Sequence, residues 1–324
     1  MAEDPAATLP VRVARIRRET EDVRSFELVS ADGAPLPAFS AGAHIDVHLG
    51  AALVRPYSLC NGPADTDRYT IGVKREPRSR GASAALHERV VEGDLLRIGR
   101  PRNHFPLHDG DAPGLLLAAG IGITPLLSMA RHLLAREGVF SLHHFARSAA
   151  QSAFHGVLAA PALAPHVAFH WGLDANTVTA RLRSLLAERE AGAQLYLCGP
   201  RAFMDAVQDA ARAAWPADAV HLEHFGGEAA ADLAPGDRFL VRLARRGLSC
   251  TVEPGQSVVQ ALQARGIALP VACEQGVCGT CLTRVLAGRP AHRDAYLSEA
   301  ERQAGDCFLP CVSRSLDPVL VLDA

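Results

Sequence analysis

The sequence predicts a multidomain protein in which an antiparallel β-barrel, an α/β domain with a parallel sheet and a small α+β domain follow one another. Length is the first reason, because 324 residues at about 150 residues per domain give two or three domains. The second is a change of pattern near Phe105, where short alternating strands give way to strands that alternate with helices. The third is a cysteine-rich segment close to the C-terminus, beyond an alanine-rich linker.

The first hundred residues carry six short β-rich runs that turn residues separate, and this pattern is typical of an antiparallel barrel of about six strands. The runs are Val11–Ile16, Ser25–Val29, His44–Leu49, Arg55–Cys60, Arg68–Arg75 and Asp94–Ile98. The proline- and glycine-rich stretch Pro106–Gly114 reads as a linker.

The middle of the chain alternates strand and helix, which predicts a parallel sheet covered on both faces. Expected strands are Leu115–Ala119, Val139–Phe145, Val167–Trp171, Gln194–Leu197 and Val220–Phe225, and helices are expected from Pro125, through Arg181–Glu188 and from Ala202. Gly226 to Gly236 reads as a second linker.

The last part predicts a hairpin, Phe239–Ala244 with Leu248–Val252, and a helix that a capping box at Ser257 and Gln260 opens. A helix over Ser298–Ala304 and a final strand, Val319–Leu322, complete a small α+β unit.

Charge and composition exclude several classes of function. A net charge of −2 provides no positive field for a phosphate backbone, so a nucleic-acid partner is not expected. The longest uncharged run, Gly114–Ala130, is interrupted by glycine and proline and fits a buried strand, turn and helix better than a membrane span. The acidic start, Met1–Pro5, lacks the features of a secretory signal. We therefore expect a cytoplasmic protein without a membrane partner.

Three of the eight cysteines, Cys273, Cys278 and Cys281, have the spacing C-x4-C-x2-C. With a later cysteine as the fourth ligand, this is the plant-type [2Fe–2S] arrangement. Gly276 and Gly279 supply the backbone freedom that a tight loop around a cluster requires. The alternatives are a zinc site, although zinc ribbons favour paired C-x2-C knuckles, or buried free thiols. The spacing leaves both Cys307 and Cys311 open as the fourth ligand.

An apolar strand runs into the glycine turn Gly120-Ile121-Gly122, with Thr124 as the expected N-cap of the next helix and Pro125 as its first residue. Such a helix start can bind a dinucleotide pyrophosphate. Cys198-Gly199-Pro200 ends another strand of the same sheet, so both turns are expected at the carboxyl edge where ligands bind. Cys198 is then either a thiol in the site or a small buried core residue.

The run Arg55–Cys60 presents a cation, an aromatic ring and a hydroxyl on one strand, enough to hold a phosphate and flank a flat ring, although an ordinary strand is the alternative. A flavin is the usual intermediary between a two-electron nicotinamide donor and a one-electron cluster. The 14 histidines form no metal-ligand motif, and His143 and His144 alternate across a strand, so both are interpreted as structural.

Taken together in this order, the motifs resemble the phthalate dioxygenase reductases, including the vanillate demethylase reductases, over essentially the whole chain. The shared segments are Arg55–Asn61, Pro101–Phe105, Gly120–Pro125, Cys198–Pro200, Glu223–Gly226, Cys273–Cys281, Cys311–Arg314 and Leu320–Asp323. The resemblance implies an FMN-binding β-barrel at 1–110, an NAD-binding α/β domain at 111–227 and a β-grasp ferredoxin domain at 237–324.

The resemblance also implies site residues. Arg55, Tyr57 and Ser58 would hold FMN, with Gly72-Val73-Lys74 along the ring edge, Gly81-Ala82-Ser83 near the phosphate, and Thr124 and Phe225 beside the ring. For Phe225 the alternative is a core phenylalanine at a strand end. Cys311 would be the fourth cluster ligand. His224 stands where the family often has serine.

The function that the resemblance implies is a monomeric NADH-dependent reductase that passes electrons through FMN and the cluster to a terminal Rieske-type oxygenase. The alternatives are a reductase of the same build for a haem monooxygenase and a non-catalytic redox-sensing module. NADH is the implied donor, although Arg147, after the second strand of the nucleotide domain, is either a loop arginine or a ligand for the 2′-phosphate of NADPH.

Overall fold

A computed structural model describes residues 8–50, 53–76, 81–187, 189–225, 238–294 and 296–324. The chain divides into two compact units, Met1–Phe225 and Gly226–Ala324. The predicted second linker lies outside the described residues.

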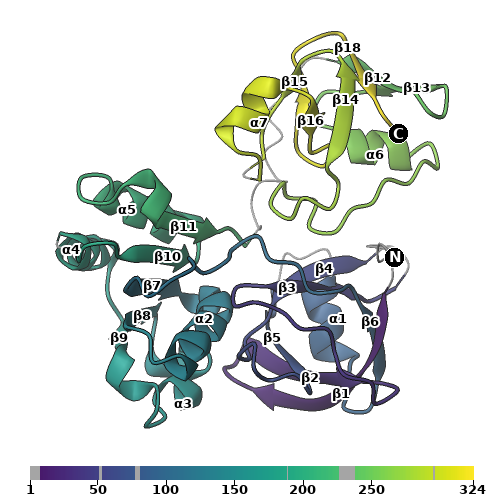
Figure 1. The fold of residues 1–324 in the computed structure, drawn as a ribbon. Coiled ribbons are helices and arrows are strands. Elements are labelled where there is room, and N and C mark those ends of the chain that lie inside the picture. The colour runs from purple at the N-terminus through teal and green to yellow at the C-terminus, as the bar shows by residue number, and fades with distance from the viewer. Residues whose placement is uncertain (1–7, 51–52, 77–80, 188, 226–237, 295) are drawn as a thin grey trace. The chain divides into compact units, whose positions relative to one another are not determined.

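The N-terminal part of the first unit is a six-stranded antiparallel sheet in the order β4-β3-β6-β1-β2-β5 (Figure 1). Its elements are β1 (Leu9–Arg18), β2 (Val23–Ser30), β3 (His44–His48), β4 (Val54–Ser58), β5 (Tyr69–Lys74), α1 (Ala82–Glu88) and β6 (Leu95–Ile98). The six predicted strands are confirmed. The sheet closes because Leu59, just after β4, bridges Ile71 of β5. Alternating apolar residues fill the interior, and Leu86 of the unpredicted α1 packs among them.

The second part of this unit is a five-stranded parallel sheet in the order β11-β10-β7-β8-β9, as predicted. Its elements are β7 (Gly114–Ala119), η1 (Gly120–Gly122), α2 (Ile123–Ala135), β8 (Phe140–Ala146), η2 (Ala149–Gln151), α3 (His155–Leu158), η3 (Ala164–His166), β9 (Val167–Trp171), α4 (Ala175–Leu186), β10 (Gln194–Cys198), α5 (Arg201–Ala211), η4 (Ala217–Ala219) and β11 (Val220–Glu223). Figure 1 shows α2 and α3 on one face of the sheet and α4 and α5 on the other.

Two helix starts differ from the prediction. The helix expected through Arg181–Glu188 begins at Ala175, because the Asp174 side chain accepts a hydrogen bond from the Thr177 backbone N–H and caps it. The helix expected from Pro125 begins at Ile123, since η1 leads directly into it.

The barrel and the parallel sheet share a core. Val23, Ala41 and Cys60 of the barrel pack with apolar residues of α2 and β7 in one buried cluster. The Ser128 hydroxyl of α2 donates to the Asn61 carbonyl, 2.8 Å away. The carboxyl edge of the parallel sheet is therefore held against the barrel at β4 and β5.

The C-terminal unit contains a mixed five-stranded sheet in the order β13-β12-β18-β14-β16. A separate two-stranded sheet pairs β15 with β17. The elements of this unit are β12 (Phe239–Leu243), β13 (Leu248–Val252), α6 (Val258–Gln263), β14 (Thr283–Ala287), β15 (Pro290–Ala291), α7 (Glu299–Ala304), β16 (Cys307–Phe308), β17 (Arg314–Ser315) and β18 (Val319–Leu322). The predicted capping box at Ser257 is present, and a second capping box, which was not predicted, starts α7 at Ser298. The hairpin, both helices and the last strand agree with the predictions, whereas β14, β15, β16 and β17 were not predicted.

Candidate functional site

Closure of the barrel places the two predicted flavin strands side by side. Arg55, Tyr57 and Ser58 lie on β4, Gly72-Val73-Lys74 lie on β5, and the Cys60 N–H donates to the Thr70 carbonyl at 2.8 Å between the strands. Burial raises the pKa of the Tyr57 phenol, so the ring stays neutral. The Lys74 ammonium pairs with Glu76 at 3.1 Å.

The predicted phosphate segment, Gly81-Ala82-Ser83, forms the start of α1. Gly81 has a φ of 101°, a left-handed conformation that glycine adopts without strain. The Ser83 hydroxyl accepts a hydrogen bond from the Glu76 N–H at 3.1 Å. This places Gly81–Ser83 beside the end of β5.

The expectation that Thr124 caps α2, with Pro125 as its first residue, is wrong. The helix starts at Ile123, its cap position is Gly122, and no side chain caps it. The Thr124 hydroxyl instead donates to the Ile121 carbonyl at 3.0 Å. Pro125 is therefore the third helical residue, where its missing N–H would have no partner within the helix in any case.

The two turns predicted at the carboxyl edge do meet there. A Cβ on Gly122 would lie 2.2 Å from the Cys198 carbonyl oxygen, and a Cβ on Gly199 would lie 2.9 Å from the Ala119 Cβ. Both positions therefore require glycine. Cys198 is fully buried at the end of β10, and this burial and the nearby Glu223 raise the pKa of its thiol. Pro200 follows as the cap residue of α5.

The nucleotide turn also touches the flavin strands. A Cβ on Gly72 would lie 2.7 Å from Thr124 Cγ2. The Ser58 hydroxyl donates to Glu223 Oε2 at 3.1 Å, across the boundary between barrel and parallel sheet. Desolvation raises the pKa of Glu223 to about 8, and the Ser58 hydrogen bond lowers it only in part. Sequence reasoning gave Glu223 no role, although its position beside Cys198 in the parallel ladder is a usable signal.

Phe225 follows β11 and is 36% exposed, which does not fit the alternative of a core phenylalanine. Its neighbour His224 has its pKa lowered by burial and by Arg201. Arg147, just beyond β8, is exposed.

Behind the glycine turn lies a contact that the sequence did not reveal. The buried His144 approaches the Gly120 carbonyl with Nε2 at 3.2 Å and the Ser152 hydroxyl with Nδ1 at 3.1 Å. Burial lowers the pKa of His144 to about 4, so its imidazole is neutral at pH 7. A carbonyl only accepts, so Nε2 donates to Gly120 and Nδ1 accepts from Ser152.

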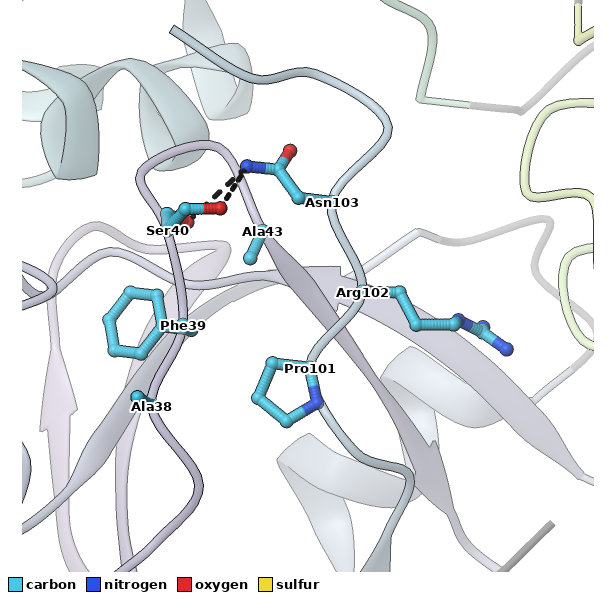
Figure 2. Close-up of a pocket in the computed structure, with 7 residues that line it drawn as sticks. All are labelled: Ala38, Phe39, Ser40, Ala43, Pro101, Arg102 and Asn103. Carbon is cyan, nitrogen blue, oxygen red and sulfur yellow. Dashed lines mark hydrogen bonds between the residues drawn. The ribbon is translucent and has the colours of Figure 1, made fainter. Parts of the chain in front are cut away.

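The motif Pro101–Phe105 has a structural role. Its first three residues, 101–103, line a hollow of about 270 Å³ together with Ala38, Phe39, Ser40 and Ala43, and none of the predicted cofactor residues lines it (Figure 2). The Asn103 amide donates to the Ser40 hydroxyl at 2.7 Å and to the Ala41 carbonyl at 2.9 Å. Asn103 therefore ties the two loops together.

The cysteine loop brings the predicted thiols together. Cys281 Sγ and Cys311 Sγ are 3.3 Å apart, and Cys273 and Cys278 hydrogen-bond to each other. The Gln275 N–H donates to Cys273 Sγ at 3.3 Å. The bond to Cys273 lowers the pKa of Cys278 to about 6. All four thiols are buried.

The glycines of this loop have the backbone freedom predicted for a tight loop around a cluster. Gly276 and Gly279 have φ values of 73° and 70°. A Cβ on Gly279 would meet the Tyr296 ring at 2.3 Å. Cys307, on β16, is only partly buried and pairs in the sheet with Arg284.

This donor set fits a [2Fe–2S] cluster, in which four thiolates ligate two irons. Among the described residues, no three His, Cys, Asp or Glu side chains are arranged around one ion. No helix in the described ranges is long and apolar enough to cross a membrane.

Comparisons with known proteins agree with this geometry. Residues 241–316 match the family described as "2Fe-2S iron-sulfur cluster binding domain". A vanillate O-demethylase oxidoreductase from Pseudomonas putida is 46% identical over 94% of this chain and 96% of its own length.

Two solved structures are similar over 98% of this chain. Phthalate dioxygenase reductase, described as a modular structure for electron transfer from pyridine nucleotides to [2Fe–2S], is 35% identical with a TM-score of 0.77, and 98% of that chain is covered. An intact type IV self-sufficient cytochrome P450 monooxygenase is 36% identical with a TM-score of 0.82, and 41% of that chain is covered.

Proposed function

The chain belongs to the phthalate dioxygenase reductase family, and from this premise we propose that it is an NADH-dependent reductase that passes electrons through FMN and a [2Fe–2S] cluster to a terminal Rieske-type oxygenase. One observation carries the proposal: Thr124 of the nucleotide turn lies against Gly72 of the flavin strand, in a chain that also gathers four thiols. When bound, FMN takes up two electrons together and releases them one at a time, as a one-electron cluster requires.

In the barrel, Arg55 supplies the cation for the FMN phosphate, because charge-assisted hydrogen bonds are the strong ones. Gly81-Ala82-Ser83 offers backbone N–H groups to the same phosphate. Tyr57 and Ser58 hold the ring, and Gly72-Val73-Lys74 runs along its edge. The small Gly72 leaves room there for Thr124.

In the parallel sheet, Gly120, Gly122 and Pro125 shape the turn that receives the NADH pyrophosphate, and Cys198-Gly199-Pro200 forms the opposite wall. Cys198, neutral and fully buried, lies beneath this wall and keeps charge away from the nicotinamide side of the site. Phe225, already partly exposed, covers the flavin ring. The exposed Arg147 is interpreted as a loop arginine, which favours NADH over NADPH.

In the C-terminal unit, the cluster is ligated by Cys273, Cys278, Cys281 and Cys311. Backbone N–H groups such as that of Gln275 stabilise the thiolates. We propose functional boundaries at 1–110, 111–227 and 237–324, and a monomer. We also propose a cytoplasmic location, since cysteines that ligate a cluster rather than form disulfides are expected in a reducing compartment.

The second candidate is a reductase of the same build that serves a haem monooxygenase. It is favoured by the similarity to 41% of the chain of a self-sufficient cytochrome P450 monooxygenase. A non-catalytic redox sensor is the third.

The test uses the purified holoprotein under anaerobic conditions. NADH should bleach both the flavin and the cluster bands, and a Rieske oxygenase should then be reduced faster than a haem monooxygenase. A faster transfer to the haem protein would favour the second candidate. Failure of NADH to bleach either band would leave the redox sensor.

A further inference from the structure

A buried carboxylate lies directly behind the cysteine loop. The side chain of Asp294 is 0% exposed. Its Oδ2 accepts from the Leu297 N–H at 2.9 Å, and its Oδ1 accepts from the Ser313 hydroxyl at 3.1 Å. The same hydroxyl accepts from the Arg293 N–H at 3.1 Å. Asp294 therefore ties the segment after β15 to Ser313, two residues beyond Cys311 and just before β17.

Asp294 also packs against the other side of the loop. A Cβ on Gly276 would lie 3.0 Å from Asp294 Cα and 2.5 Å from Val312 Cγ2. The segments that carry Asp294 and Val312 are therefore in close contact with this glycine. The Gly276 N–H in turn hydrogen-bonds to the Cys311 sulfur. Gly276 therefore contacts Asp294 on one side and the Cys311 sulfur on the other.

The carboxylate also accepts from the Tyr296 N–H at 3.3 Å, whereas the nearest cationic groups lie farther away. Arg302 of α7 approaches Oδ2 at 3.9 Å, but its guanidinium donates instead to the Asp294 carbonyl, at 2.5 Å. His292 Nδ1 lies 3.7 Å from Oδ1, and neither nitrogen of His292 has a hydrogen-bond partner. In a buried environment of low dielectric, a carboxylate whose nearest cations are 3.7–3.9 Å away acts over several ångströms.

We propose that Asp294 is a positioning residue that holds the cysteine loop and lowers the reduction potential of the [2Fe–2S] cluster, an inference that rests on the proposed function. Reduction adds one electron, and so one negative charge, to the cluster. A fixed carboxylate nearby opposes that charge. Removing the carboxylate should therefore favour the reduced form, and removing its cation Arg302 should disfavour it.

The experiment is a redox titration of the full-length holoprotein, followed by the electron paramagnetic resonance signal of the reduced cluster. Asp294→Asn keeps the shape, and the Ser313 hydroxyl can turn to accept from the new amide. At a fixed potential, the ratio of reduced to oxidised cluster should rise about tenfold, which is 59 mV for one electron. The flavin midpoint should not move.

The matched control is Asp317→Asn, which removes the same charge from a residue that pairs with Arg289 and not with the loop. Its cluster midpoint should equal that of the wild type. An unchanged midpoint in Asp294→Asn, or an equal shift in both variants, would overturn the inference.

A second variant keeps the test decisive if Asp294→Asn does not assemble the cluster. Arg302→Met removes the partly exposed cation. It should lower the midpoint potential of the cluster, whereas Asp294→Asn should raise it. A higher or unchanged midpoint potential in Arg302→Met contradicts the inference. If NADH fails to reduce the wild-type cluster, the proposed function fails. If NADH reduces the cluster and the variants do not shift, only the role of Asp294 fails.

Discussion

At the scale of single residues, Arg55 is the cation on which FMN retention should depend. A hydrogen bond to a charged group contributes about 1.5–3 kcal/mol, so Arg55→Ala should weaken FMN binding about tenfold to a hundredfold. The cluster should remain, because its ligands belong to the other compact unit. Flavin content after dialysis measures the effect. A variant that keeps one FMN per chain would contradict this role of Arg55.

Glu223 should make stability depend on pH. Its pKa is raised from 4.5 to about 8 in the folded protein, so between these values the folded state binds more protons than the unfolded state. Stability then falls as pH rises through this window. Glu223→Gln removes that loss, so its melting temperature relative to wild type should rise steadily from pH 5 to pH 8. Parallel profiles for the two proteins would show that Glu223 ionises normally.

At the scale of elements, the turn between β7 and α2 depends on a residue of the neighbouring strand. His144 of β8 holds the Gly120 carbonyl from behind. His144→Phe removes that hydrogen bond, worth about 1 kcal/mol, and should raise the KM for NADH about fivefold while FMN and cluster contents stay unchanged.

The adjacent His143→Phe is the control for His144→Phe. His143 contacts His170, at 3.0 Å, rather than the turn. Its KM for NADH should stay within about twofold of wild type. Equal KM values for the two variants would show that the Gly120 contact does not position the nucleotide.

At the scale of the whole molecule, the two compact units should separate two activities. Thiolates assemble the cluster, so Cys311→Ser should lose it and keep FMN. NADH should still reduce ferricyanide through the flavin, whereas electron delivery to cytochrome c or an oxygenase should fall sharply.

Cys307→Ser is the counterpart and should retain both cofactors and both activities. Loss of the cluster in Cys307→Ser, with an intact cluster in Cys311→Ser, would reverse the ligand assignment. Undiminished delivery to the oxygenase without a cluster would refute the order of transfer.

The sequence by itself determined the features that local chemistry specifies. Alternating apolar residues, glycine turns and capping boxes depend on neighbours within a few positions. The first two sheets, three strands of the third sheet, most helices and the C-x4-C-x2-C loop could therefore be predicted. The assignment of an individual N-cap residue from sequence was less reliable. Thr124 looks like an N-cap, but the preceding 3₁₀ turn already continues into the helix, and its hydroxyl bonds back to Ile121.

Only the tertiary structure decided which distant residues meet. The contacts of Ser58 with Glu223, of Gly120 with His144 and of Gly276 with Asp294 join segments that no spacing rule connects. Each follows from strand order or from the packing of loops on a sheet, and each buries a polar group whose partner lies elsewhere in the chain. Burial and long-range pairing set the pKa values and the charge balance of such groups, and neither can be read from a residue's neighbours in sequence.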